Sequence, residues 1–514
     1  MPEPEPKSYA KRLVKGSIII FTASVLSAFI AILLRAFLAR SLNAADYGLF
    51  YFIFSLISLP TLFYDWGFCK ALARYTPEFF VKKEFGAIKS SMALVTLLQA
   101  ISALSIVAVL LVFSNQIALT IFKTGAAVLP LRILCVWILV NVVYRILGAT
   151  FQGLQNMPAL ALIGFLLDMS NFLMVVLFVG VIGWGVGGVA VAYFAAMSAV
   201  TVFGLAYLMR RYSQVFKEKM LINKPLFKKL FVFALPVFIG SLAFIVLQYA
   251  DTLLIGVLRT NAEVGFYQVA QPIASLLLYL VGALSTVFFP MVSEMWTKGE
   301  SRILRSAMHF LTKFSFVLLI PATLVIVAFP DIIIRLIFGE GYLAGATALQ
   351  ILGSASIVYT LFTILFITIN GICKPIIGMG VVGAMACLSL VGNLLLIPSY
   401  GIEGAATAFF ASYALGSLLL FYFVRKFLRF TMPILPLFKT VVGGVLTLLL
   451  IFGLKFLLPL SPWPEAFAVM IPSLLFYGVW ILATGAITKD DLRLIARIVP
   501  MPKWLVKLIS KLVK

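Results

Sequence analysis

The chain has 514 residues, of which 63% are hydrophobic and only 11% are charged. A soluble globular domain carries about 45–50% apolar and about 25% charged residues, so this composition excludes a soluble enzyme, a disordered chain and a nucleic-acid-binding domain. The net charge of +22 does not indicate a nucleic-acid partner, because the basic residues are dispersed over many short connections.

The N-terminal tail, residues 1–16, is rich in Pro and Glu and then in basic residues, like the flank of a signal peptide. The apolar run that follows is too long for a signal core and lacks an Ala-x-Ala exit, so we expect a first membrane span that is retained. Only helices or closed barrels satisfy the backbone in lipid, and the apolar runs of this chain are too long for barrel strands.

Runs of membrane-spanning length, about 20 apolar residues, recur fourteen times along the chain. We expect the spans at residues 17–39, 47–64, 90–113, 127–150, 158–180, 186–209, 230–258, 264–290, 306–329, 347–370, 375–398, 402–424, 434–458 and 466–488. The sequence therefore predicts an all-α polytopic membrane protein whose short connections leave no room for a separate soluble domain.

Lys and Arg are distributed unevenly between the two sides of these spans. Most of the 40 lie in the two tails and in alternate connections, above all in residues 65–89 and 210–229. The connections on the opposite side hold only Arg40, Lys123, Arg259, Arg335 and Lys455. Because basic loops stay in the cytoplasm, we expect both termini to be cytoplasmic, in a multi-pass protein of the cytoplasmic (inner) membrane.

Short motifs recur at an offset of about 217 residues, which indicates an internal repeat. Asp46 and Gly48 match Glu263 and Gly265, and GVGGVAVAYFAA from Gly185 matches GIEGAATAFFAS from Gly401. Each repeat holds six spans, an even number, so both repeats enter the membrane in the same direction, with the pseudo-two-fold axis along the membrane normal. This pattern predicts two parallel six-helix lobes around a central cavity, with transport by rocking of the lobes.

The domain boundaries follow from these repeats. We expect an N-lobe over 1–209, a cytoplasmic inter-lobe linker over 210–229, a C-lobe over 230–426, two extra spans over 427–488, and a cytoplasmic tail over 489–514. In that tail, lysines and apolar residues fall on opposite faces of a short helix, which is typical of a basic helix that lies on anionic lipids.

Three segments carry a resemblance to a known family: LARSLNAADYGLF (38–50), RILGATFQGLQNM (145–157) and QYADTLLIGVLRTNAEVGFYQVAQPI (248–273). They resemble the polysaccharide-transporter branch of the multidrug/oligosaccharidyl-lipid/polysaccharide (MOP) exporter superfamily, which includes O-antigen and lipid II flippases. The resemblance covers nearly the whole chain. It implies that a polyprenyl-(pyro)phosphate-linked oligosaccharide is flipped from the inner to the outer leaflet by alternating access, in the synthesis of a cell-surface polysaccharide or a glycoprotein glycan.

Charged and polar residues inside the spans are functional candidates, because a charge at the bilayer centre costs at least about 2.5 kcal/mol. Guanidinium forks suit phosphate oxygens, whereas amide and phenol groups suit sugars. The expected substrate-binding residues are Arg35, Arg132, Arg145, Asn141, Gln152, Tyr267 and Gln271. The structural alternative for Arg35 or Arg145 is an internal ion pair with Asp168.

Arg132 has a different alternative, which is that its side chain snorkels to the outer interface. Asp168 and Asp251 are expected either to carry a coupling H+ or Na+, or to serve as charge partners of arginines. We expect no further cofactor and no metal site, because Cys69, Cys135, Cys373 and Cys387 form no Cys-x-x-Cys pair and His309 is the only histidine. The expected partners are a lipid-linked oligosaccharide and anionic lipids, with the protein as a monomer.

Two other functions remain open at this point. The first is a drug or cation antiporter of the multidrug and toxin extrusion (MATE) type with the same fold. Drug extruders usually have twelve spans, and cation extruders favour acidic cavities. In this chain, three arginines and two aspartates lie within the expected spans. The second is a membrane glycosyltransferase or polymerase, which would need a carboxylate pair and a sizeable outer loop. The sequence shows neither feature, so we expect a transporter and not an enzyme.

Overall fold

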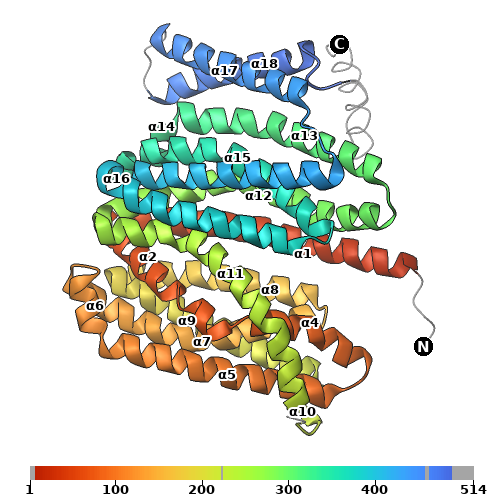
Figure 1. The fold of residues 1–514 in the computed structure, drawn as a ribbon. Helices are drawn as coiled ribbons and strands as arrows, with labels where there is room; N and C mark the ends of the chain where they lie inside the picture. The colour runs from red at the N-terminus through yellow and green to blue at the C-terminus, as the bar shows by residue number, and fades with distance from the viewer. Residues whose placement is uncertain (1–5, 221–223, 458–461, 489–514) are drawn as a thin grey trace. The chain divides into compact units, whose positions relative to one another are not determined.

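The computed structural model describes residues 6–220, 224–457 and 462–488. Within these ranges the chain forms helices and no strand (Figure 1). The first half contains α1 (Pro6–Ser41), α2 (Ala44–Ser58), α3 (Thr61–Asp65), α4 (Phe68–Val81), α5 (Phe85–Val112), α6 (Ser114–Thr120), η1 (Gly125–Ala127), α7 (Val128–Gly153), α8 (Met157–Val175), η2 (Val176–Val181), α9 (Gly185–Arg211) and α10 (Ser213–Lys217). The second half contains α11 (Lys224–Leu258), α12 (Asn261–Thr297), α13 (Ser301–Ala328), α14 (Pro330–Ile337), η3 (Glu340–Gly345), α15 (Ala346–Gly371), α16 (Pro375–Leu428), α17 (Ile434–Leu457) and α18 (Pro462–Ala483).

Twelve helices among the described residues are long and apolar enough to cross a membrane. One of them, α16, holds two of the expected spans, because Gly401 takes φ 57° and ψ −133° and breaks the helix between them. The expected span 264–290 falls within α12, which is not among the twelve. The all-helical polytopic fold is therefore confirmed, whereas the count of fourteen and the internal repeat stay predictions.

The described helices belong to two compact units. One comprises Met1–Val269 with Ala386–Ala405, and the other comprises Ala270–Met385 with Ala406–Lys514. The first unit extends past the expected linker because α11 packs against α2 and α4. The lobes predicted at 1–209 and 230–426 stay a prediction, and the expected tail at 489–514 lies outside the described residues.

In the first unit, helices pack side by side whether or not they follow one another along the chain: α7 lies against α5 and α9, α8 lies against α9, and α1 lies against α8 (Figure 1). Lipid supplies no hydrophobic drive for helix association, so close packing depends on small residues. At Gly153 of α7, an added Cβ would lie 2.6 Å from the Cβ of Thr76 on α4. Glycine at this position therefore lets α4 and α7 approach each other.

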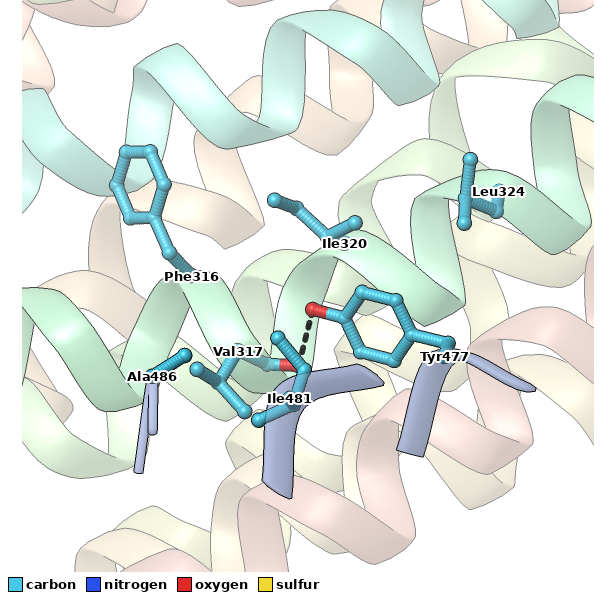
Figure 2. Packing of buried hydrophobic residues seen from close by; sticks show 7 residues of the cluster. All are labelled: Phe316, Val317, Ile320, Leu324, Tyr477, Ile481 and Ala486. Atoms are coloured by element: carbon cyan, nitrogen blue, oxygen red, sulfur yellow. Dashed lines mark hydrogen bonds between the residues drawn. The ribbon is translucent and has the colours of Figure 1, made fainter. Parts of the chain in front are cut away.

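In the second unit, the expected extra spans form α17 and α18, which pack on α13. Figure 2 shows Tyr477 of α18 donating a hydrogen bond to the Val317 carbonyl of α13, at 3.1 Å. An added Cβ at Gly443 of α17 would lie 2.3 Å from the Trp480 ring of α18, and the indole nitrogen of Trp480 donates to the Lys439 carbonyl at 2.9 Å. The extra pair is thus an integral part of its unit.

Candidate functional site

Arg35 of α1 lies among residues of α2 and the start of α12. Its Nη1 donates to both the backbone oxygen and the Oε1 of Gln268, each at 3.1 Å. Its guanidinium carbon lies 4.6 Å from the centroid of the Tyr51 ring, which is a cation–π contact. The guanidinium therefore has a fixed position, although the sequence around it shows only a stripe of small residues.

A hydrogen-bonded cluster continues from Gln268 to α11. Gln268 Nε2 donates to Thr252 Oγ1 at 2.7 Å, and the Thr252 backbone amide donates to Asp251 Oδ1 at 2.7 Å. Tyr267 donates from its hydroxyl to Asp251 Oδ2 at 2.6 Å. The structure therefore brings together three residues that the sequence singled out separately: Arg35, Tyr267 and Asp251.

A second polar cluster forms around Arg145 of α7. Its Nη2 lies 3.0 Å from Asp65 Oδ2, in an ion pair whose side chains are 39% exposed for Arg145 and 11% exposed for Asp65. Asp65 Oδ1 accepts from Gln99 Nε2 at 2.8 Å. Beside this pair, Asn141 Nδ2 donates to the Tyr64 hydroxyl at 2.8 Å. Two of the expected substrate-binding residues, Arg145 and Asn141, thus lie in one network.

Asp65 is the central member of this second cluster, and sequence reasoning missed it. The residue ends α3, and Gly67, with φ 76°, reverses the chain into α4. Asp65 Oδ1 then accepts from the Cys69 backbone amide at 3.1 Å, in the first turn of α4. An Asp shortly before a helix is a common capping signal, and that signal could have marked Asp65 as a residue that bonds to the first turn of α4.

The remaining expected site residues differ in exposure and in their contacts. Arg132 is exposed, and its Nε and Nη2 donate to Ser114 Oγ at 2.9 Å and to Asn115 Oδ1 at 3.3 Å. These bonds join Arg132 of α7 to the start of α6. Gln152 is exposed, and Gln271 is half-buried.

Asp168 of α8 lies in hydrogen-bonding contact with Ser27 of α1. The partner of Arg145 is Asp65, not Asp168, and Arg35 contacts an amide instead of a carboxylate. The ion pair with Asp168 that we considered from the sequence is therefore replaced by other contacts at both arginines.

Metal ligands do not cluster in the described part of the chain: no group of three or more His, Cys, Asp or Glu residues lies close enough together to hold an ion. His309 Nε2 lies 2.6 Å from the Thr431 carbonyl oxygen, and the histidine is half-buried. The chemistry available at the two clusters is thus hydrogen bonding and charge, which suits binding of a polar, anionic group.

Two further contacts join α11 to α4 and the start of α12 to α2. At one end of α11, Glu78 of α4 accepts from Lys229 Nζ at 3.0 and 3.1 Å and from Lys82 Nζ at 2.8 Å. Just beyond the other end, Gly48 of α2 meets Gly265 of α12. A Cβ added at Gly48 would lie 2.6 Å from the Gly265 backbone nitrogen and 1.8 Å from the Asn261 carbonyl oxygen.

Comparison with known proteins gives these clusters a context. A family model described as polysaccharide biosynthesis protein matches residues 13–296, more than half of the chain. The uncharacterized membrane protein MJ1068 of Methanocaldococcus jannaschii is 26% identical, over 92% of this chain and 95% of the relative. The probable low-salt glycan biosynthesis flippase Agl15 of Haloferax volcanii is 23% identical, over 95% of this chain and 100% of the relative.

Solved structures share the fold at low sequence identity. The lipid II flippase MurJ in an inward closed conformation superposes with a TM-score of 0.72 and 13% identity, over 91% of this chain and 98% of that one. A multidrug resistance MATE family transporter of the MOP superfamily, in an inward-facing conformation, has a TM-score of 0.68 and 12% identity, over 80% of this chain and 98% of that one. At such identities the likeness establishes the fold alone.

Proposed function

The chain belongs to the polysaccharide biosynthesis protein family, within the MOP superfamily, and we propose that it is a flippase for a polyprenyl-(pyro)phosphate-linked oligosaccharide. The proposal rests above all on one observation: two arginines stand in the membrane-spanning part of the first unit, and each is held in place by a buried polar cluster. A fixed guanidinium is suited to the phosphate oxygens of a lipid-linked glycan.

The two arginines stand at different depths. On the proposed topology α1 runs outward, which places Arg35 about 9 Å before its outer end, and α7 runs inward, which places Arg145 about 12 Å before its inner end. The hydrocarbon core is about 30 Å thick. Arg145 is therefore placed to receive a phosphate from the inner leaflet, and Arg35 to hold it on the way to the outer leaflet.

The contacts of Arg145 leave it able to bind such an anion. An arginine carries five N–H donors, and the ion pair with Asp65 involves Nη2. The side chain is 39% exposed, so an incoming phosphate can approach its other donors. In this proposal Asp65 orients the guanidinium, and the bond from Asn141 to the buried Tyr64 hydroxyl stabilises the polar cluster beside it.

The proposal has three further parts. Transport proceeds by alternating access, as the solved neighbours with inward-facing and outward-facing titles suggest for their own proteins. Both termini are cytoplasmic, in the cytoplasmic membrane of a monomeric protein whose partners include anionic lipids. Asp168 or Asp251 carries a coupling H+ or Na+.

The alternative is a MATE-type antiporter of drugs or cations, which the fold also allows. A cationic substrate would be repelled by Arg35 and Arg145, so charge favours the anionic glycolipid. The relatives whose printed names state a role are flippases, transporters or a sporulation protein, so a transporter is favoured over an enzyme.

Binding to the purified full-length chain distinguishes these functions. We expect native mass spectrometry to show a complex with a short-chain polyprenyl pyrophosphate, weakened by Arg145→Ala and unchanged by Arg132→Ala. The Arg132 variant is a matched control, because it removes an exposed arginine from the same helix. Retention of a lipophilic cation such as ethidium, without binding of the pyrophosphate lipid, would instead support the antiporter.

A further inference from the structure

Arg35 and Asp251 are joined by a continuous series of hydrogen bonds, although their side chains lie on different helices. Arg35 Nη1 contacts Gln268 Oε1 at 3.1 Å, Gln268 Nε2 contacts Thr252 Oγ1 at 2.7 Å, and Thr252 Oγ1 lies 3.4 Å from Asp251 Oδ1. The series thus runs from a cation on α1, through an amide on α12 and a hydroxyl on α11, to a carboxylate on α11. We call these four residues the Arg35–Asp251 relay.

The direction of every donor in the relay is fixed by chemistry. A guanidinium only donates, so it must face the oxygen of Gln268 and not its nitrogen. The Gln268 nitrogen then donates to the Thr252 hydroxyl, which uses its own hydrogen toward the carboxylate of Asp251, a group that only accepts. Flipping the Gln268 amide would place two donors face to face at Arg35. The relay therefore has one orientation, from the positive end to the negative end.

The relay is shielded from solvent and firmly held. The exposed fractions are 5% for Gln268, 2% for Thr252 and 4% for Asp251. In such a setting hydrogen bonds in series polarise one another, so a change of charge at one end alters the strength of the bond at the other. The second oxygen of Asp251 is occupied by Tyr267, so the carboxylate cannot turn away from Thr252.

Two adjacent pairs of residues hold α11 and α12 in register. Tyr267 bonds Asp251 and Gln268 bonds Thr252, and both pairs are separated by the same sixteen positions along the chain. The titratable side chain that acts on Asp251 is Tyr267 on α12. Those that act on Arg35 are Tyr47 and Tyr51 on α2 and Tyr193 on α9. Asp168 acts on Tyr193 and is a second carboxylate near Arg35, whereas Asp251 is the carboxylate at the end of the hydrogen-bonded series.

We propose that the relay couples the charge of Asp251 to the availability of Arg35 for an anion. While Asp251 is charged, it polarises Thr252 and Gln268 and strengthens the hold of Gln268 on the guanidinium. When a cation neutralises Asp251, that hold weakens and the guanidinium turns to the phosphate of the substrate. Gln268 and Thr252 act here as positioning residues. The role of the phosphate rests on the proposed function, whereas the coupling between Asp251 and Arg35 does not.

A double-mutant cycle in the full-length chain tests the relay, with inorganic pyrophosphate as the probe and calorimetry as the measurement. The four proteins are the wild type, Asp251→Asn, Gln268→Met and the double variant. We expect Asp251→Asn to raise the affinity for pyrophosphate about threefold or more in the wild-type background, as coupled residues do. In the Gln268→Met background the same change should leave the affinity unaltered. Asp331→Asn, which removes an exposed carboxylate, is the control for net charge.

A second measurement keeps the test independent of the substrate. Modification of Arg35 by phenylglyoxal, followed by mass spectrometry, should be faster in Asp251→Asn than in the wild type, and equally fast in both Gln268→Met proteins. Equal effects of Asp251→Asn with and without Gln268 in both measurements would overturn the relay. Coupled labelling without any binding of pyrophosphate would uphold the coupling and refute the assignment of Arg35 to the substrate.

Discussion

At the scale of single residues, the three arginines expected to bind substrate differ in their contacts. Arg35 and Arg145 are each held by a cluster of polar side chains, whereas Arg132 is exposed and bonds to Ser114 and Asn115. A position fixed by neighbours is what recognition of a phosphate requires, because the fork of an arginine must meet two oxygens at once. Arg35 and Arg145 are thus the stronger candidates.

Replacing Arg145 tests whether geometry or charge matters at this position. We expect Arg145→Lys to impair flipping almost as much as Arg145→Ala, because a lysine keeps the charge but loses the fork. The ion pair with Asp65 is partly exposed, so we expect each variant to lose only about 1 kcal/mol of stability. Flipping rates and thermal unfolding midpoints check both statements.

The double variant Arg145→Ala with Asp65→Ala distinguishes recognition from structural neutralisation. If Arg145 only neutralises Asp65, removing both charges should restore much of the activity that Arg145→Ala loses. We expect no such recovery. Recovery of activity would mean that Arg145 has only a structural role. The matched control is Arg145→Ala with Asp168→Ala, because Asp168 contacts Ser27 and not Arg145.

At the scale of elements, an ion pair joins α11 to α4. Lys229 and Lys82 bond Glu78 and lower the pKa of its carboxyl from 4.5 to about 2. A carboxyl group whose pKa is lower in the folded state stabilises that state at pH values above the pKa of the unfolded chain. This stabilisation is lost as the pH falls through the pKa of the folded state. The contact should therefore hold at neutral pH and weaken only in acid.

The variant Glu78→Gln measures this contact. We expect it to lower the unfolding midpoint at pH 5–8 by a constant amount, because Glu78 is charged in both states over that range. The difference from the wild type should shrink as the pH falls from about 4.5 toward 2. A difference that persists unchanged at low pH would show that the charge of Glu78 is not what joins α4 to α11.

Gly48 and Gly265 form the contact between α2 and α12, and only glycine fits there. We expect Gly48→Ala to push the helices apart, because its Cβ would meet the Asn261 oxygen and the Gly265 nitrogen. The expected result is slower flipping and faster thiol labelling of Ala44→Cys from outside intact cells, with the exposed Cys373 and Cys387 changed to Ser. Gly164→Ala, where an added Cβ meets nothing within 4 Å, should have no effect on either measurement.

The extent to which the sequence predicts these elements differs with the kind of signal. Long apolar runs fix the helices, and the break between the runs 375–398 and 402–424 falls at Gly401, where the helix is indeed interrupted. Contacts between helices are not encoded in periodicity. In the sequence, Asp65 is the first residue of the basic connection 65–89 and Thr252 carries no signal, because only the fold shows that Arg145 and Gln268 contact them.

At the scale of the whole molecule, the account depends on the orientation of the chain in the membrane. The positive-inside pattern predicts a cytoplasmic connection between α9 and α11. A cysteine at Ser213 should therefore be labelled by an impermeant reagent only after permeabilisation. Ala45→Cys, in the exposed first turn of α2, should be labelled in intact cells. The reverse pattern would invert the depths assigned to Arg35 and Arg145.

The central claim is that this chain moves a lipid-linked oligosaccharide across the bilayer with fixed arginines holding its phosphate. Its most direct test is a flipping assay with the purified chain in proteoliposomes that contain a fluorescent polyprenyl-pyrophosphate-linked glycan. The account predicts that the glycan becomes accessible to a reagent in the opposite compartment faster than in empty vesicles. It also predicts that Arg35→Ala and Arg145→Ala each abolish most of this gain while Arg132→Ala retains it. Wild-type vesicles that flip the glycan no faster than empty ones would contradict the claim.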